Sequence, residues 1–329
     1  MMKKYLLTLF LLMAVIPAWA SSKNNAPSIV GNDDRKEITY IPKGLEGAAV
    51  VIRIESSGQF CSGAMVGPNI VLTAAHCLDW KGKFKKEAVV FAVATDKNKI
   101  NVRTSNKDIK DNQNSPILQQ FTFPIDTTMS NDSIASIATA VYRTAEEKNK
   151  NTSLSSPPLN FGSCFSATGT KIFVPTSYHK AYTNPADDYG FLILDEPIGN
   201  TIGYFALKEP KPEEIKDAKI VIIGRPGDKP IDTLWESPGH IGKIDKNYNV
   251  HFDADVLPGN SGGPILLEEN PYEIIGIFVT VNSSDKYVEG GYPNNGILIR
   301  ESIILAVQEL QKNPEQEIDG FTSANINRR

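Results

Sequence analysis

The sequence predicts an all-β fold, and two features of its patterning support this. Apolar stretches of a few residues recur along the 329-residue chain, each bounded by Gly, Pro, Asn or Asp, and stretches with helical periodicity are few. Short strands separated by turn residues are typical of barrels and sandwiches, and the pattern alone does not distinguish the two. The expected strands span residues 48–54, 70–72, 88–93, 171–174, 191–194, 218–223, 250–252, 264–267, 274–281 and 296–299.

One clear helix is expected at residues 300–311. There Ile303, Val307 and Leu310 recur at spacings that place them on a single apolar face. The residues that follow, 313–329, are polar, and we expect them to form a mobile tail.

A long polar stretch at about 103–165 separates two groups of expected strands. Asn, Ser, Lys, Asp and Thr dominate it, and only residues 134–141 are compatible with a helix. Long insertions add little loop-closure free energy, and they are often functional when they border a site. We therefore interpret this stretch as an insertion.

The first twenty residues have the pattern of a signal peptide. Two lysines precede an apolar run at 5–16, and the small residues Ala18 and Ala20 follow. A membrane anchor is the alternative, but the run is short for a bilayer and no second hydrophobic segment follows. We expect cleavage after Ala20, a secreted or periplasmic protein, and no stable membrane anchor. Residues 21–28 are then a short pro-segment or a loose terminus.

The charge of the chain argues against a nucleic-acid partner. The formal net charge is −4, and the sequence contains no long basic run. Such a chain has no electrostatic attraction to phosphate.

Two separated motifs indicate nucleophilic catalysis. His76 ends an apolar run and directly precedes Cys77, while Ser261 lies in the glycine-rich stretch 259–264. A serine hydroxyl needs a base within hydrogen-bond reach, and the base needs a partner that fixes its tautomer. Asp188, which precedes the expected strand 191–194, is a candidate for that partner. Either motif alone could be structural, a packed histidine or a turn, but the order His, Asp, Ser makes both together improbable.

With these motifs, the chain resembles the chymotrypsin-fold serine proteases, and the match to the bacterial glutamyl-endopeptidase-like branch is closer still. Further likenesses are the segments 29–35 and 224–230, the latter followed by Trp235. The resemblance covers about 29–312, apart from a stretch near 100–165. It implies two Greek-key β-barrels with the active site between them, the first at about 29–205 and carrying the insertion, the second at about 206–299. The C-terminal helix should dock on the second barrel.

The resemblance also implies a disulfide. Three cysteines in an exported chain leave one without a partner in the same chain. Cys61 and Cys77 flank the His strand as the equivalent pair does in the family, so we expect them to pair. A loop of about 15 residues closed in this way contributes about 3 kcal/mol in the chain-entropy model. Cys164 then remains, and we expect a buried, unreactive thiol.

The acid is chosen between two adjacent carboxylates. In the family, one variable residue, a small residue and an apolar strand follow the acid, and Asp188 satisfies this with Gly190 as the small residue. Asp187 would be one residue out of register and point to the other face. The remaining histidines, His179, His240 and His251, are expected to be ordinary surface or packing residues.

The oxyanion hole is expected from the backbone N–H groups of Gly259 and Ser261. No metal and no cofactor is expected, because the histidines and cysteines lack zinc-ligand spacing and no carboxylate-rich calcium loop is recognisable.

Activation should differ from that of trypsin-like digestive enzymes. Those enzymes have an Asp where this chain has Asn260, and that Asp pairs with the newly formed N-terminal ammonium. Asn260 cannot supply the charge, and Ser28 precedes Ile29, so the bond that a trypsin would cut is missing. We expect processing close to Ser28 or Ile29.

The substrate pocket is assigned to Asp255, Val256 and Phe278. Asp255 lies six residues before Ser261, where trypsin-like enzymes keep an Asp that binds Arg or Lys. Val256 and Phe278 stand where glutamyl endopeptidases have groups that contact the substrate carboxylate. Neither donates a side-chain hydrogen bond, so a buried substrate carboxylate would be under-satisfied, at a cost of about 1–3 kcal/mol. We expect no strict Glu specificity and a slight preference for basic over apolar residues.

The sequence thus predicts an exported, monomeric serine endopeptidase that cleaves polypeptides through an acyl-enzyme. Two alternatives remain. One is a catalytically silent homologue that binds a protein through its insertion. The other is an esterase on the same fold, which shares the chemistry and differs in what the cleft admits.

Overall fold

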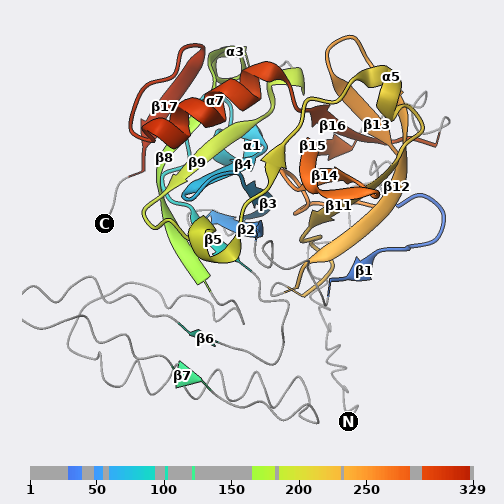
Figure 1. The fold of residues 1–329 in the computed structure, drawn as a ribbon, viewed down its shortest axis with the longest axis horizontal. Coiled ribbons are helices and arrows are strands. Elements are labelled where there is room, and N and C mark those ends of the chain that lie inside the picture. The colour runs from blue at the N-terminus through green and yellow to red at the C-terminus, as the bar shows by residue number, and fades with distance from the viewer. Residues whose placement is uncertain are drawn as a thin grey trace, which may run out of the picture.

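The structure, a computed structural model, describes residues 29–38, 48–54, 59–92, 101–102, 121–122, 165–181, 185–230, 233–281 and 291–326. The described chain forms two closed six-stranded antiparallel barrels that lie side by side (Figure 1). The all-β prediction is confirmed, and closure of both sheets decides for barrels over a sandwich.

The first barrel is closed by pairing between its first and last strands. Its strand order is β8-β5-β2-β3-β4-β9, with β8 also paired to β9. The strands are β2 (Ala49–Ile54), β3 (Gln59–Met65), β4 (Ile70–Thr73), β5 (Val89–Ala92), β8 (Phe165–Pro175) and β9 (Gly190–Leu194).

The second barrel repeats this plan. Its order is β12-β11-β14-β15-β16-β13, closed by pairing of β12 with β13. The strands are β11 (Lys219–Gly224), β12 (Trp235–Ile244), β13 (Asn249–Phe252), β14 (Pro264–Leu267), β15 (Asn270–Val281) and β16 (Asn294–Leu298), with the short β10 (Ala206–Leu207) parallel to β15.

Within the described residues, the helical segments are short except for one. They are α1 (Ala75–Leu78), α3 (Thr176–Ala181), a 3-10 turn (Pro185–Asp187), α4 (Gly199–Ile202), α5 (Pro212–Ile215) and α7 (Glu301–Lys312). The predicted C-terminal helix is confirmed as α7, and Ile303, Val307 and Leu310 are buried as expected.

The strands of the first barrel are apolar on both faces, which explains their continuous apolar runs. In β2, Val50 and Ile52 belong to the core inside the first barrel, whereas Ala49 and Val51 belong to a second cluster. Successive side chains of a strand point to opposite faces. The second cluster also contains Ile277 and Val279 of β15, so it joins the two barrels into one body.

The N-terminal segment belongs to the second barrel, not to the first as predicted. The short strand β1 (Lys36–Glu37) pairs with β12. Just before it, the buried guanidinium of Arg35 forms ion pairs with Asp33 (2.8 Å) and with Asp228 (2.7 Å), which follows β11. Because Arg35 bonds to it, the pKa of the Asp33 carboxyl lies well below its usual range.

Both predictions for the C-terminal region need correction. The helix α7 packs against β4 of the first barrel rather than docking on the second, and Gln311 donates a hydrogen bond to the Val66 carbonyl (3.0 Å). The expected mobile tail contains strand β17 (Phe321–Asn325), which pairs with β8. In Figure 1, α7 and β17 both lie over the first barrel.

Several predictions lie outside the described residues. These concern the signal peptide at 1–20, the segment 21–28, the helix at 134–141 and Cys164. Of the expected insertion, the structure describes β7 (Phe121–Thr122), which pairs with β6 (Asn101–Val102), and Phe165, the first residue of β8. Among the described helices, none has the length and apolar character needed to cross a membrane.

Candidate active site

His76 is held at the start of the short helix α1, directly after strand β4. The predicted disulfide is present: Cys61 of β3 and Cys77 of α1 are bonded, which ties this helix to the neighbouring strand. Strand β4 pairs with β9, and Thr73 lies opposite Gly190. This register brings His76, which follows β4, and Asp188, which precedes β9, to the same edge of the barrel.

Asp188 contacts His76 through both of its carboxylate oxygens. One oxygen accepts the backbone N–H of His76 at 2.8 Å, and the other lies 2.8 Å from Nδ1 of the imidazole. Two contacts to one residue fix both its backbone and its ring. An Nδ1–H that donates to Asp188 leaves Nε2 as the free acceptor on the far side of the ring.

Asp187 points elsewhere, as predicted. Its carboxylate accepts hydrogen bonds from Ser177 Oγ (2.8 Å) and from Arg300 (3.3 Å). The need for a small residue at Gly190 also has a visible cause, since a Cβ there would lie 2.7 Å from the Phe173 carbonyl oxygen.

Two effects of opposite sign act on the imidazole of His76. Burial lowers its pKa, while the charge of Asp188 and the hydrogen bond to it raise it, and the net result is a raised pKa. Asp188 thus stabilises the imidazolium that forms when the ring takes up a proton.

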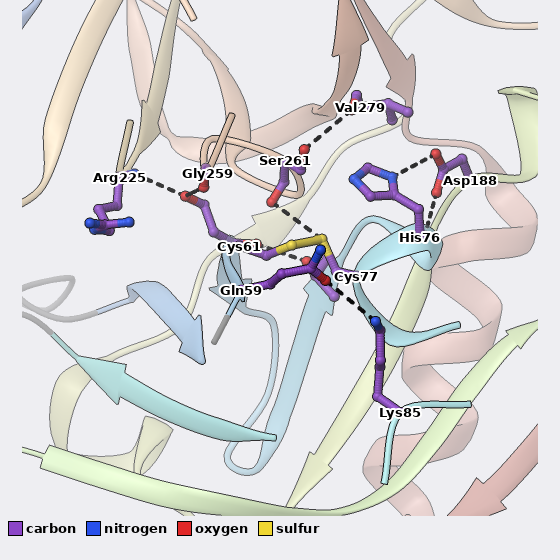
Figure 2. The surroundings of a disulfide bond; sticks show 12 residues. Gln59, Cys61, His76, Cys77, Lys85, Asp188, Arg225, Gly259, Ser261 and Val279 are labelled. Atoms are coloured by element: carbon purple, nitrogen blue, oxygen red, sulfur yellow. Dashed lines mark hydrogen bonds and ion pairs between the residues drawn. A yellow bond between two sulfur atoms is a disulfide. The ribbon is translucent and has the colours of Figure 1, made fainter. Parts of the chain in front are cut away.

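Ser261 lies across from His76 on the second barrel. In the view of Figure 2, the imidazole of His76 lies between Asp188 and Ser261. The carbonyl oxygen of Ser261 is 3.8 Å from Sγ of Cys77, which places the loop against α1. The hydroxyl of Ser261 donates to the Val279 carbonyl (3.4 Å) in this structure and not to His76. Catalytic hydrogen bonds are often long or absent before substrate binds.

The N–H groups of Gly259 and Ser261, the expected oxyanion donors, belong to peptide groups whose carbonyls accept hydrogen bonds. The carbonyl of Pro258 accepts the N–H of Gly227 (2.7 Å), and the carbonyl of Asn260 accepts the N–H of Gly263 (2.8 Å). In a trans peptide the N–H points opposite to the carbonyl, so the N–H groups of Gly259 and Ser261 face away from these contacts. Neither N–H donates to any described residue. Gly259 has φ of 105°, a conformation that a residue with a Cβ rarely adopts.

The two cysteines near His76 are oxidised to a disulfide, and a disulfide does not offer a metal the thiolate ligands it would need. Within the described chain, potential ligands gather at Cys61, His76 and Cys77, whose ligand atoms lie within 4.8 Å of one another. Both sulfur atoms belong to the disulfide, and a metal needs thiolates.

The three residues assigned to the substrate pocket are all buried in the structure. Val256 and Phe278 pack in the core of the second barrel. Asp255 is also buried, and its carboxylate accepts the backbone N–H groups of Val30 (2.7 Å) and Asp34 (3.3 Å). Burial raises the pKa of Asp255, and these two hydrogen bonds counteract that rise. In this structure the Asp255 carboxylate therefore anchors the N-terminal segment.

His179 was expected to be an ordinary residue, but the structure gives it a carboxylate partner. Its Nδ1 lies 2.5 Å from Oδ2 of Asp79, a side chain with no exposed surface. His240 lies 3.6 Å from Asp253 on the surface, and His251 is buried in β13. No local motif marks the pairing of His179 with Asp79, which are separated by 100 positions.

Comparison with known proteins agrees with the geometry of the site. Residues 61–277 match the family model of the trypsin-like peptidase domain. The chain therefore belongs to the trypsin-like peptidase family.

Within that family, the chain is similar to glutamyl endopeptidases. It is 26% identical to the glutamyl endopeptidase of Bacillus licheniformis over 249 residues, which is 75% of this chain and 57% of the relative. It is 39% identical to that of Staphylococcus aureus strain MW2 over 87 residues, 26% of this chain and 23% of the relative. The matches thus span little more than half of one relative and about a quarter of the other.

A solved structure shows the same fold. It is a Glu endopeptidase in complex with MPD, with a TM-score of 0.56 and 18% identity, and the match covers 87% of this chain and 100% of that one. This supports the two-barrel fold predicted from the sequence motifs.

Proposed function

We propose that this chain is an exported serine endopeptidase that cleaves polypeptides through an acyl-enzyme. Ser261 is the nucleophile, His76 the base, and Asp188 the residue that orients the imidazole and stabilises the imidazolium when it forms. The observation that carries the proposal is the double contact of Asp188 with His76, directly across from Ser261. Family membership supports the same class of reaction.

The proposed reaction follows from where the protons can go. Nε2 of His76 takes the hydroxyl proton as Ser261 Oγ attacks the substrate carbonyl, and the N–H groups of Gly259 and Ser261 bind the oxyanion that forms. The imidazolium then protonates the leaving amine, and an acyl group remains on Ser261. Water, activated by the same imidazole, releases the second product and restores the hydroxyl.

Export is proposed from the sequence and is compatible with the disulfide. The first twenty residues have signal-peptide features, and disulfides persist in oxidising compartments outside the cytoplasm. Intact-mass measurement of the secreted protein would locate the mature N-terminus. We expect processing after Ala20 and a second cut close to Ser28 or Ile29.

For substrate preference, we propose cleavage that is not restricted to Glu. Phe278 and Val256 have apolar side chains within the core, and they offer a substrate carboxylate no side-chain donor. The expected slight preference for basic residues depended on a free Asp255, which here accepts two backbone N–H groups, so it is not carried into this proposal. Digestion of a peptide library followed by mass spectrometry tests this, and dominant cleavage after Glu would contradict it.

A fluorophosphonate probe tests the reaction class directly. Wild-type protein is expected to carry one label, on Ser261, and the Ser261→Ala variant none. A processed wild-type protein that is never labelled would support the silent homologue instead. Labelled protein that hydrolyses esters but no peptide would support the esterase.

A further inference from the structure

The loop that carries both oxyanion donors is not held by the second barrel alone. It contacts strand β3 of the first barrel, at the residue that follows the disulfide cysteine Cys61. This residue is Ser62, whose side chain is fully buried and is not part of the proposed triad. Its sequence position gives no hint of a role, because it lies 199 positions before Ser261 in the chain.

Every polar atom of Ser62 has a partner. Its backbone N–H donates to the carbonyl of Ser261 (2.8 Å), and its Oγ donates to the carbonyl of Gly259 (2.8 Å). The same Oγ accepts the backbone N–H of Arg225 (2.9 Å), and its carbonyl accepts the hydroxyl of Thr73 (2.7 Å).

These contacts fix the peptide that follows Gly259. Its carbonyl is held by Ser62 Oγ, and the N–H on its other side, that of Asn260, donates to the Leu257 carbonyl (3.0 Å). The preceding peptide is held by the hydrogen bond from Gly227 to Pro258. Gly259 lacks a Cβ and would otherwise rotate freely, so its N–H direction depends on both anchors.

Arg225 anchors the other end of this bridge. Its guanidinium lies 4.7 Å from the ring centroid of Phe60, also on β3. The Ser62 hydroxyl therefore joins three segments: β3, the turn after β11, and the oxyanion loop. Removing this buried hydroxyl therefore takes away both the hydrogen bond to the Gly259 carbonyl and the one from the Arg225 N–H.

We propose that Ser62 is a positioning residue for the oxyanion hole. Its hydroxyl orients the Gly259 N–H from across the barrel interface, so that the donor is in place before the oxyanion forms. This inference rests on the proposed function, since it assigns Ser62 to the same reaction. Ser62 touches neither substrate nor the reacting atoms; it acts through Gly259.

The test compares Ser62→Ala with Ser237→Ala. Ser237 is a matched control, because its hydroxyl is equally buried in β12 and has no hydrogen-bond partner among the described residues. Removing an oxyanion donor outright lowers kcat by about 10²–10³, so loss of its positioning by Ser62→Ala is expected to lower kcat by about tenfold to a hundredfold with KM nearly unchanged. Ser237→Ala is expected to keep both.

A transition-state analogue separates positioning from general loosening of the fold. A peptidyl boronic acid forms a tetrahedral adduct on the nucleophilic serine, so its inhibition constant should rise in Ser62→Ala by the same factor by which kcat/KM falls. Unchanged boronate affinity, or kcat within about twofold of wild type, would overturn the proposal. If Ser62→Ala does not fold, Ser62→Gly removes the same hydroxyl and keeps the N–H bond to Ser261. Wild-type protein that neither cleaves peptides nor binds the boronate would instead reject the proposed function itself.

Discussion

Two of the histidine–carboxylate pairs among the described residues resemble each other closely and yet differ in what surrounds them. His76 pairs with Asp188 and His179 with Asp79, each through Nδ1, and both histidine side chains are 24% exposed. The two pairs lie at the two ends of α1, since His76 is inside that helix and Asp79 directly follows it. A histidine bonded to a carboxylate is therefore no sign of catalysis by itself.

The difference lies in what else surrounds each imidazole ring. His76 has Ser261 on the side of the ring away from Asp188 (Figure 2). His179 instead stacks on Phe84, with ring centroids 4.8 Å apart. The backbone differs too: Asp188 also holds the N–H of His76, whereas Asp79 uses its own backbone N–H to bond the Ala75 carbonyl. Proton transfer is the role proposed for the first pair, whereas the second joins α3 to the loop after α1.

The largest expected contrast comes from removing each histidine. His76→Ala should lower kcat by about 10⁶, because base and nucleophile act as a unit in a comparable serine protease. His179→Ala should keep the kcat of the folded protein but lower its stability by about 3 kcal/mol, because it leaves a buried carboxylate without its partner. Active-site titration with steady-state kinetics gives the first quantity, and urea unfolding gives the second. A large loss of kcat per active site in His179→Ala would show that the pairs are not functionally distinct.

Neutralising the carboxylates sharpens the same contrast. Asp188→Asn should lower kcat by about 10⁴, since an amide in this position favours the wrong imidazole tautomer. His179→Ala leaves the buried Asp79 carboxylate without its partner, whereas Asp79→Asn replaces that carboxylate with a neutral amide. We therefore expect Asp79→Asn to keep the wild-type kcat and to lose less stability than His179→Ala. Equal loss of turnover in the two variants would reject this assignment.

How far the sequence predicted this site depends on whether a local motif was present. His76, Asp188 and Ser261 each lie in a short motif, and the β4–β9 pairing that joins the first two is implied by the fold. The Asp79–His179 pair and the role of Ser62 were missed. Both depend on contacts between distant segments, and a single Asp or Ser in a sequence does not reveal which backbone it will meet.

The errors in the fold have a related cause. The segment 313–326 looked like a tail because most of its residues are polar. However, β17 pairs its backbone with β8, and the scattered apolar residues Phe321 and Ile326 pack against the core. Asp255 was assigned to a pocket by its spacing from Ser261. Spacing could not show that the N-terminal segment returns across the second barrel and places the N–H of Val30 on that carboxylate.

A third expected contrast concerns pH. The pKa of His76 is raised by Asp188 against the effect of burial, so the acid limb of kcat/KM should have its midpoint above the ordinary histidine value of about 6.5. A raised folded-state pKa means that the protonated ring stabilises the fold. That contribution is complete below about pH 6.5 and is lost as pH rises through the folded-state pKa.

The stability effect can be measured without autolysis in a Ser261→Ala background. The difference in unfolding free energy between Ser261→Ala and Ser261→Ala/His76→Gln should shrink as pH rises from 6 to 9. A difference that is constant over this range would contradict the raised pKa. The corresponding double variant with His179→Gln serves as the comparison for the second pair.

The smallest expected effect separates Asp187 from its neighbour Asp188. Asp187→Asn keeps the side-chain shape but weakens the hydrogen bonds to Ser177 and Arg300, at a cost of about 1 kcal/mol in stability. Its kcat should stay close to wild type, because its carboxylate faces α3 and Arg300 rather than His76. Kinetics of Asp187→Asn and Asp188→Asn under identical conditions decide the matter. If Asp187→Asn lost as much turnover as Asp188→Asn, strand register would not identify the carboxylate that orients His76. The contact between Asp188 and the His76 ring would then not be what distinguishes the two residues in catalysis.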